Sequence, residues 1–177
     1  MMQAKKLKTA VVEILQGDIT SMKTDVIVNF TDTSLRMKTG VGAALKAKGG
    51  VEIEAQALQK APAAAGSVFE TGAGNLFPRY IIHTAVMGGS FKAAEDNIKT
   101  GVRNALQLAE KLKMETAAFP APGGGMPGFL PERSAEILFE EIMMFDNSGP
   151  VHVKRIYSVL FAKRVFDVFY DRFRKIK

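Results

Sequence analysis

The order of apolar and polar residues predicts short strands that alternate with amphipathic helices. Runs rich in β-branched and other apolar residues predict strands at 9–16, 25–30, 67–74, 79–86, 115–121 and 152–161. Apolar residues that recur every three or four positions predict helices at 40–50, 51–61, 93–114, 131–145 and 164–176. This alternation is typical of an α/β domain with helices on both faces of a sheet.

Length and composition indicate one globular domain, residues 1–177. The chain has 177 residues, of which 47% are apolar, so it can bury a sizeable core. It has no cysteine, which excludes disulfides, thiolate metal sites and a cysteine nucleophile. Because no apolar run reaches the roughly 18 residues of a membrane helix and no signal-peptide pattern is found, we expect a cytoplasmic protein without membrane contact.

Positive charge is concentrated near the C-terminus. The net charge is +6, and the segment 154–177 holds Lys154, Arg155, Lys163, Arg164, Arg172, Arg174, Lys175 and Lys177 against Asp167 and Asp171. This excess of positive charge suits an anionic partner such as a nucleotide or nucleic acid. The alternative interpretation is a basic surface that contacts only solvent. Steep weakening of oligonucleotide binding with salt would distinguish the two.

Candidate chemistry lies in the loops after the strands, because ligands of α/β sheets bind outside the carboxyl ends of strands. The first such loop is Gly17-Asp18-Ile19-Thr20. An Asp after a Gly is usually a turn or helix-cap residue. In the functional alternative, the Asp18 carboxylate accepts from an exocyclic amine such as that of adenine, and the Ile19 N–H donates to a ring nitrogen.

The second loop follows the strand 25–30 and leads into a helix. Asn29, Asp32, Gly40 and Gly42 surround it. Free N–H groups and the helix dipole at such a turn favour phosphate. A plain connecting turn between strand and helix is the alternative.

The third loop, 120–129, has three consecutive glycines between prolines, which lets backbone approach a ligand closely. Phe161, at the end of the last strand, either stacks on a base or is an ordinary core aromatic. His83 lies in an apolar strand, where a hydrogen-bonded core residue is commoner than a catalyst. The common nucleotide and zinc motifs are absent from the sequence, and we expect no metal and no cofactor.

Taken in order, these stretches resemble the macrodomain family, which binds ADP-ribose. The resemblance is carried by GDIT at 17–20, DVIVNFTD at 25–32 followed by GVGAALKAKGG at 40–50, LFPRYIIHTAV at 76–86 and GGGMPGF at 123–129. It spans about residues 9 to 173. It implies a three-layer α/β/α sandwich with a mixed central sheet and an ADP-ribose cleft at its crest.

Position by position, the resemblance implies that Asp18 and Ile19 bind the adenine edge and Phe161 packs on its face. Residues 40–42 and 123–128 would be the phosphate loops, and the distal ribose would lie near Asn29 and Asp32, which are also the candidate catalytic residues. The expected ligand-binding residues are Gly17, Asp18, Ile19, Asn29, Asp32, Gly40, Val41, Gly42, Gly123, Gly124, Gly125, Met126, Pro127, Gly128, Phe129 and Phe161.

Departures from the family pattern lie near the distal ribose and phosphates. Asp32 replaces the second Asn of the family's Asn-Ala-Ala-Asn stretch, and Gly42 stands where hydrolytic members commonly carry an acid. Pro127 replaces the usual aromatic of the second phosphate loop, and residues 37–39 replace glycines in the first. An Asn amide donates and accepts, whereas ionised Asp32 only accepts and adds a charge near an anionic ligand.

We therefore expect a binding module for ADP-ribose, an ADP-ribosylated macromolecule or a related adenine diphosphate nucleotide, with weak or absent hydrolase activity. In one alternative, Asp32 is the general base of an ADP-ribosyl hydrolase or of an ADP-ribose 1''-phosphate phosphatase. In a further alternative, the basic C-terminal region binds nucleic acid.

Overall fold

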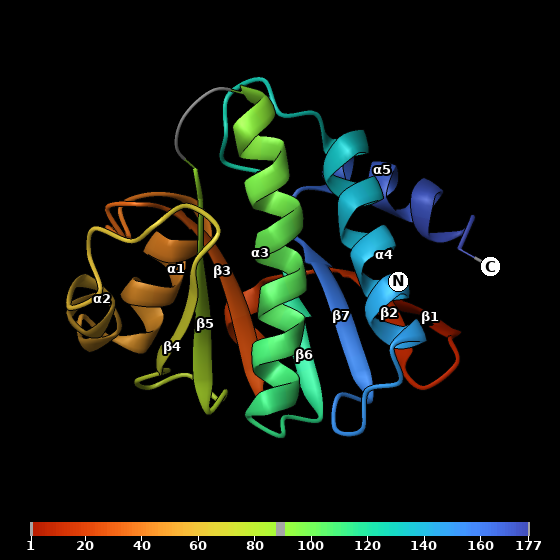
Figure 1. Cartoon of the computed structure of the whole chain (residues 1–177), viewed down its shortest axis with the longest axis horizontal. Helices are drawn as coiled ribbons and strands as arrows, with labels where there is room; N and C mark the ends of the chain where they lie inside the picture. Colours follow the sequence, from red (N-terminus) through yellow and green to blue (C-terminus); the bar gives the residue numbers. More distant parts are fainter. Residues whose placement is uncertain (1, 88–90, 177) are drawn as a thin grey trace.

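A computed structural model describes residues 2–87 and 91–176, so Lys177 of the basic segment lies outside the described residues. Within them, seven strands form one mixed sheet in the order β1-β2-β7-β6-β3-β5-β4 (Figure 1). The strands are β1 (Met2–Lys6), β2 (Val11–Gln16), β3 (Val26–Asp32), β4 (Val68–Gly72), β5 (Tyr80–Met87), β6 (Thr116–Phe119) and β7 (Arg155–Leu160). The inner strands run parallel, and the edge strands β1 and β4 run antiparallel to their neighbours.

Helices cover both faces of the sheet, which confirms the predicted α/β/α sandwich. On one face lie α3 (Phe91–Lys111), α4 (Pro131–Asn147) and α5 (Lys163–Phe173), and on the other lie α1 (Gly40–Gly49) and α2 (Glu52–Leu58) (Figure 1). A short 3₁₀ helix, η1 (Ile19–Ser21), follows β2. No helix in the described ranges combines the length and the apolar character that crossing a membrane requires.

The sheet separates two hydrophobic cores because successive strand residues point to opposite faces. In β3, Val26 and Val28 belong to the larger core, which contains Ile98 of α3, while Ile27 belongs to the smaller core with Leu45 of α1. All five side chains are fully buried. A strand buried on both faces reads as a continuous apolar run, which is why β3 could be predicted.

β1 was not predicted, because its sequence MQAKK has no β-branched residue. It pairs with β2 along its whole length. Lys5 Nζ donates to the carbonyl oxygens of Arg174 (2.7 Å) and Ile176 (2.5 Å), just beyond α5. Pairing with β2 and the contacts of Lys5, rather than the strand propensity of its own residues, therefore stabilise β1.

The β1–β2 turn is anchored by the carboxylate of Asp146, near the C-terminal end of α4. Its oxygens accept the N–H groups of Lys8 (2.8 Å), Thr9 (2.9 Å) and Ala10 (2.9 Å) and the hydroxyl of Thr9 (2.7 Å). Burial raises the pKa of Asp146, but the hydrogen bonds from Thr9, Ala10 and Lys8 outweigh it and hold the pKa below its ordinary value.

Asp146→Ala leaves these N–H groups without their acceptor. We expect its free energy of unfolding in urea at neutral pH to fall by about 2–4 kcal/mol. The control Asp171→Ala breaks an exposed ion pair with Arg174 and should cost less than about 0.5 kcal/mol. Since the folded-state pKa of Asp146 is depressed, its contribution is present above the unfolded pKa and is lost as pH falls through the folded value. If Asp146→Ala and Asp171→Ala lowered the free energy of unfolding by similar amounts at neutral pH, the anchoring role of Asp146 would be contradicted.

Candidate functional site

The predicted loops meet at the carboxyl edge of the sheet. β2, β7, β6 and β3 are parallel neighbours, so the loops that follow them leave the sheet at one edge. These loops begin at Gly17, Phe161, Pro120 and Thr33. In Figure 1 the loop 120–130 lies at the top, above the ends of the strands. Segments far apart in the sequence are thus brought together.

Asp18 is both a helix cap and one half of an ion pair. Its Oδ1 accepts the N–H (2.9 Å) and the hydroxyl (2.6 Å) of Thr20 at the start of η1, as the turn interpretation predicts. Its Oδ2 lies 2.6 Å from Nζ of Lys48, in the last turn of α1. Lys48, and then Thr20, lower the pKa of Asp18 to about 2. The carboxylate is therefore ionised at neutral pH.

Lys48 was not singled out from the sequence. It lies 30 positions after Asp18, and nothing in the pattern distinguishes it from Lys46, which pairs with Glu54 (3.0 Å). A lysine in a helix usually indicates only a solvated surface. Because α1 packs beside η1, a tertiary feature, Lys48 reaches Asp18 and joins the candidate site.

Phe161 follows β7 directly and is 81% exposed, so it is not a core aromatic. Its carbonyl oxygen accepts a long hydrogen bond from Gln16 Nε2 (3.4 Å), and the N–H of Gly17 donates to the carbonyl of Leu160 (2.9 Å). Phe161 therefore lies beside the segment that contains Asp18. An exposed ring at this place is available to stack on a base.

The segment that leads into the first predicted phosphate loop is anchored in the core. Leu35 and Met37 are 0% and 1% exposed, and Glu54 Oε1 accepts the N–H of Met37 (2.8 Å). Leu35 has a positive φ of 58°, an unusual conformation for a leucine. Met37 packs in the smaller core.

α1 begins at Gly40, and its N-cap Thr39 makes no side-chain cap hydrogen bond. The first N–H groups of such a helix favour an anion. A Cβ at Gly42 would lie 3.4 Å from Met37 and 3.5 Å from Asn29 Oδ1. An acidic side chain at this position would therefore be crowded by Met37 and face the Asn29 oxygen.

Asn29 lies beneath this turn and is only 1% exposed. Its Nδ2 is 3.2 Å from Nδ1 of His83, whose Nε2 is 2.9 Å from Thr71 Oγ1, and Thr71 donates to the Gly72 carbonyl (3.0 Å). An amide nitrogen only donates, so Nδ1 accepts and the proton is on Nε2. Burial lowers the pKa of His83 to about 4, and the ring stacks on Phe69. The expected hydrogen-bonded core histidine is confirmed.

Asp32 ends β3 with one carboxylate oxygen already engaged. Its Oδ1 accepts the N–H (2.7 Å) and the hydroxyl of Ser34, and the pairing of β3 with β5 shifts register between Thr31 and Asp32. The carboxylate thus closes an Asx turn, which an Asn could also close. The side chain is half-buried, at the edge where the distal ribose was expected.

The glycines of the loop 120–130 have different roles. Gly123 has φ 70°, and a Cβ there would lie 2.7 Å from Ile98 and 2.9 Å from Phe129. Gly125 is exposed, and a Cβ there would meet nothing within 4 Å. Phe129 is 8% exposed and belongs to the larger core. Gly123 and Phe129 therefore hold the loop in place, while Gly125 is exposed and faces open space.

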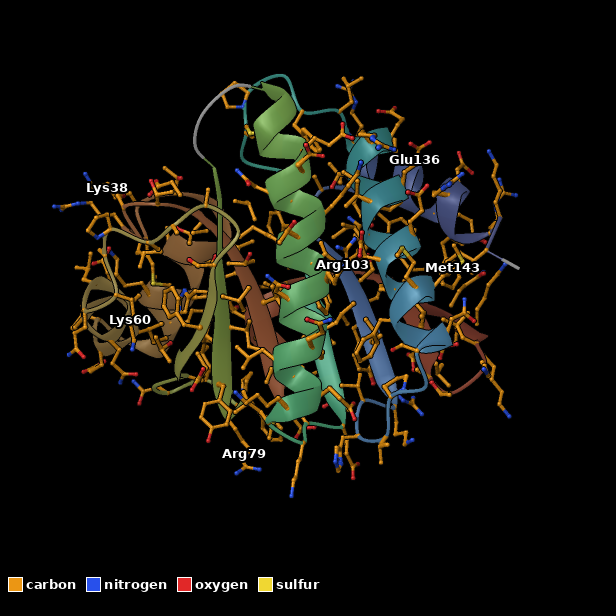
Figure 2. All side chains as sticks on the ribbon, in the orientation of Figure 1. Lys38, Lys60, Arg79, Arg103, Glu136 and Met143 are labelled. Carbon is orange, nitrogen blue, oxygen red and sulfur yellow. The ribbon has the colours of Figure 1, made fainter. Side chains whose placement is uncertain are left out.

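A separate hollow of about 390 Å³ lies between α3 and α4. Arg103, Glu110 and Met144 are among its lining residues, and none of the predicted ligand-binding residues lines it. Figure 2 shows Arg103 on α3, on the side facing α4, where it pairs with Glu141 (2.8 Å). This hollow is not part of the candidate site.

Comparisons with known proteins identify the family. The Macro domain family matches residues 28–138. The human protein mono-ADP-ribosyltransferase PARP14 is 33% identical over 171 residues, which are 96% of this chain but 9% of that protein. An uncharacterized protein of Aquifex aeolicus is 35% identical over 136 residues, 76% of this chain and 82% of that protein. The chain belongs to the macrodomain family.

Solved macrodomain structures have the same fold as this chain. The Oceanobacillus iheyensis macrodomain with ADP has a TM-score of 0.90 at 26% identity, covering 98% of this chain and 95% of that one. A mutant of it with ADPR has a TM-score of 0.89, again at 26% identity, covering 98% and 97%. A Trypanosoma brucei macrodomain has a TM-score of 0.83 at 20% identity, covering 92% and 68%, and shows the shared fold.

The buried neutral His83 makes folding stability depend on pH. The unfolded chain binds a proton below about pH 6.5, whereas the folded ring does so only near pH 4. The stabilisation is thus present above the unfolded pKa and is lost as pH falls from 6.5 toward 4. We expect the free energy of unfolding to be about 1.4 kcal/mol lower at about pH 5.5 than at about pH 7.5.

Urea unfolding at both pH values measures this, with His83→Gln as the control that removes the titrating group. NMR of the His83 ring gives a second measurement in the wild type. A ring that protonates near pH 6.5, or an equal pH dependence in His83→Gln, would contradict the prediction.

Proposed function

We propose that this chain is a binding module for ADP-ribose or a related adenine diphosphate nucleotide, with weak or absent hydrolase activity. One observation carries the proposal: the exposed Phe161 lies beside the segment that carries the ionised Asp18, at the edge where α1 begins and Gly125 is exposed. The Oceanobacillus iheyensis macrodomain, solved with ADP and as a mutant with ADPR, supports it.

Each part of such a ligand has a chemically suited partner at this edge. An aromatic ring stacks on any base, and a carboxylate accepts from an exocyclic amine. Helix N–H groups and glycine backbone suit phosphates, and the net charge of +6 favours an anion. Stacking, amine recognition and phosphate binding at one edge favour an adenine diphosphate over an isolated phosphate.

The groups near the distal ribose support binding more than hydrolysis. Gly42 offers no acid, and Asn29 is buried under the loop. Asp32 is the one carboxylate among these three residues, and its Oδ1 already accepts a hydrogen bond from Ser34. A general base has to reach the proton that it removes, and Asp32 has only one oxygen left for that role.

Calorimetric titration of ADP-ribose, with ADP for comparison, tests the proposal. Ligand at about 100 times its dissociation constant should also raise the free energy of unfolding by about 2.7 kcal/mol. We expect Phe161→Ala to weaken binding about ten- to hundredfold through lost base stacking. Phe77→Ala removes a ring that is 67% exposed at the opposite edge of the sheet and should leave binding unchanged. No heat and no stabilisation with either ligand would refute the proposal.

The enzymatic alternative depends on Asp32 as general base in an ADP-ribosyl hydrolase or an ADP-ribose 1''-phosphate phosphatase. Asp32→Asn keeps the Oδ1 acceptor for Ser34, so the turn should survive. On our proposal the variant binds ADP-ribose as well as the wild type or up to about tenfold more tightly, because a negative charge near the ligand is removed. A wild type that turns over such substrates, with a loss of at least about a hundredfold in Asp32→Asn, would establish the alternative.

Nucleic-acid binding finds less support, because the basic C-terminal residues are dispersed. Lys154 and Arg155 lie where β7 begins, while Lys163 lies beyond its other end. Arg155 and Lys163 form ion pairs with Glu13 (2.6 Å) and Asp167 (2.7 Å). This arrangement favours a solvated basic surface. The cytoplasmic location remains a prediction from the sequence.

A further inference from the structure

Asp18 offers an incoming base only one of its carboxylate oxygens, and that oxygen is already in contact with a cation. Thr20 occupies Oδ1 with two hydrogen bonds, so Oδ2 is the oxygen left for a ligand. Lys48 Nζ lies 2.6 Å from Oδ2. The side chains of Lys48 and Asp18 are 53% and 34% exposed. Any base that reaches Oδ2 therefore also meets the ammonium group.

We propose that Lys48 reads the purine base together with Asp18, so that the site accepts diphosphates of 6-oxopurines, hypoxanthine and guanine, as well as of adenine. The inference rests on the proposed nucleotide-binding function and assigns its base specificity.

The chemistry follows from donors and acceptors on the base. Adenine presents an amine donor at position 6, and a 6-oxopurine presents an acceptor oxygen there with an N–H donor at the neighbouring N1. A carboxylate only accepts and an ammonium only donates. A carboxylate alone would repel the oxygen at position 6. With Lys48, that oxygen gains a donor while the carboxylate accepts from N1–H.

The contact of Lys48 differs from that of its neighbour Lys46. Lys46 pairs with Glu54, which also accepts the Met37 N–H and so belongs to the structure of the first loop. Among the described residues, Lys48 makes its hydrogen bond to Asp18 alone. An exposed pair of this kind adds little to stability. Lys48 is therefore free to change partner when a base arrives.

Titrations of ADP and inosine diphosphate into the wild type, Lys48→Met and Lys163→Met test the inference. Removing a positive charge weakens the binding of both diphosphates equally, so this general effect drops out of the ratio of their two dissociation constants. Lys163→Met is matched, because Lys163 also forms an exposed pair at this edge, with Asp167 (2.7 Å). We expect the dissociation constants of ADP and inosine diphosphate to differ by less than about tenfold in the wild type. We expect Lys48→Met to raise the preference for ADP by about tenfold or more. Lys163→Met should leave the ratio unchanged.

A wild-type preference for ADP above about a hundredfold, or a ratio that Lys48→Met does not change, would overturn the inference while ADP binding upholds the proposed function. Absence of binding by ADP, inosine diphosphate and ADP-ribose would instead overturn the proposed function and the inference with it. Carboxyl NMR of the free protein adds a readout without ligand. The pKa of Asp18 should rise from about 2 toward 3.8 in Lys48→Met, and an unchanged value would mean that the pair does not form.

Discussion

The parallel pairing of the inner strands is the constraint on which the rest of the molecule depends. In a parallel ladder every strand ends at the same edge, so β2, β3, β6 and β7 deliver their following loops to one place. The register is fixed because a slip by one residue would exchange the two buried faces. Segments as distant as those that carry Asp18 and Phe161 lie beside each other for this reason, and the candidate site is a consequence of the sheet.

Several of the polar side chains buried in the sheet are hydrogen-bonded to one another. Asn29, His83 and Thr71 lie on three adjacent strands and form one chain of contacts beneath the first loop. A buried polar group costs free energy unless it has a partner, and a neutral imidazole can accept on one side and donate on the other. Burial keeps His83 uncharged by lowering its pKa, and the neutral ring holds its two hydrogen bonds beneath the first loop.

The sequence predicted what is local and missed what depends on packing. The helices and the inner strands followed from periodicity, and Asp18 and Phe161 were singled out as candidates because they stand at the ends of strands. β1 was missed because its pairing with β2, not its composition, forms it. Lys48 was missed for the same reason, since only the fold brings it to Asp18. The family resemblance placed Phe129 among the ligand-binding residues, because a motif does not show which side chains the packing buries.

The anchoring of the first loop by Leu35 and Met37 has a kinetic consequence. A loop fixed by buried side chains and by Glu54 has few conformations left to lose when a ligand arrives. This loop would then need no slow closing step before a ligand associates and no opening step before it leaves. For a ligand bound beside this loop, affinity differences would then be expressed mainly in dissociation rates, which the contacts themselves set.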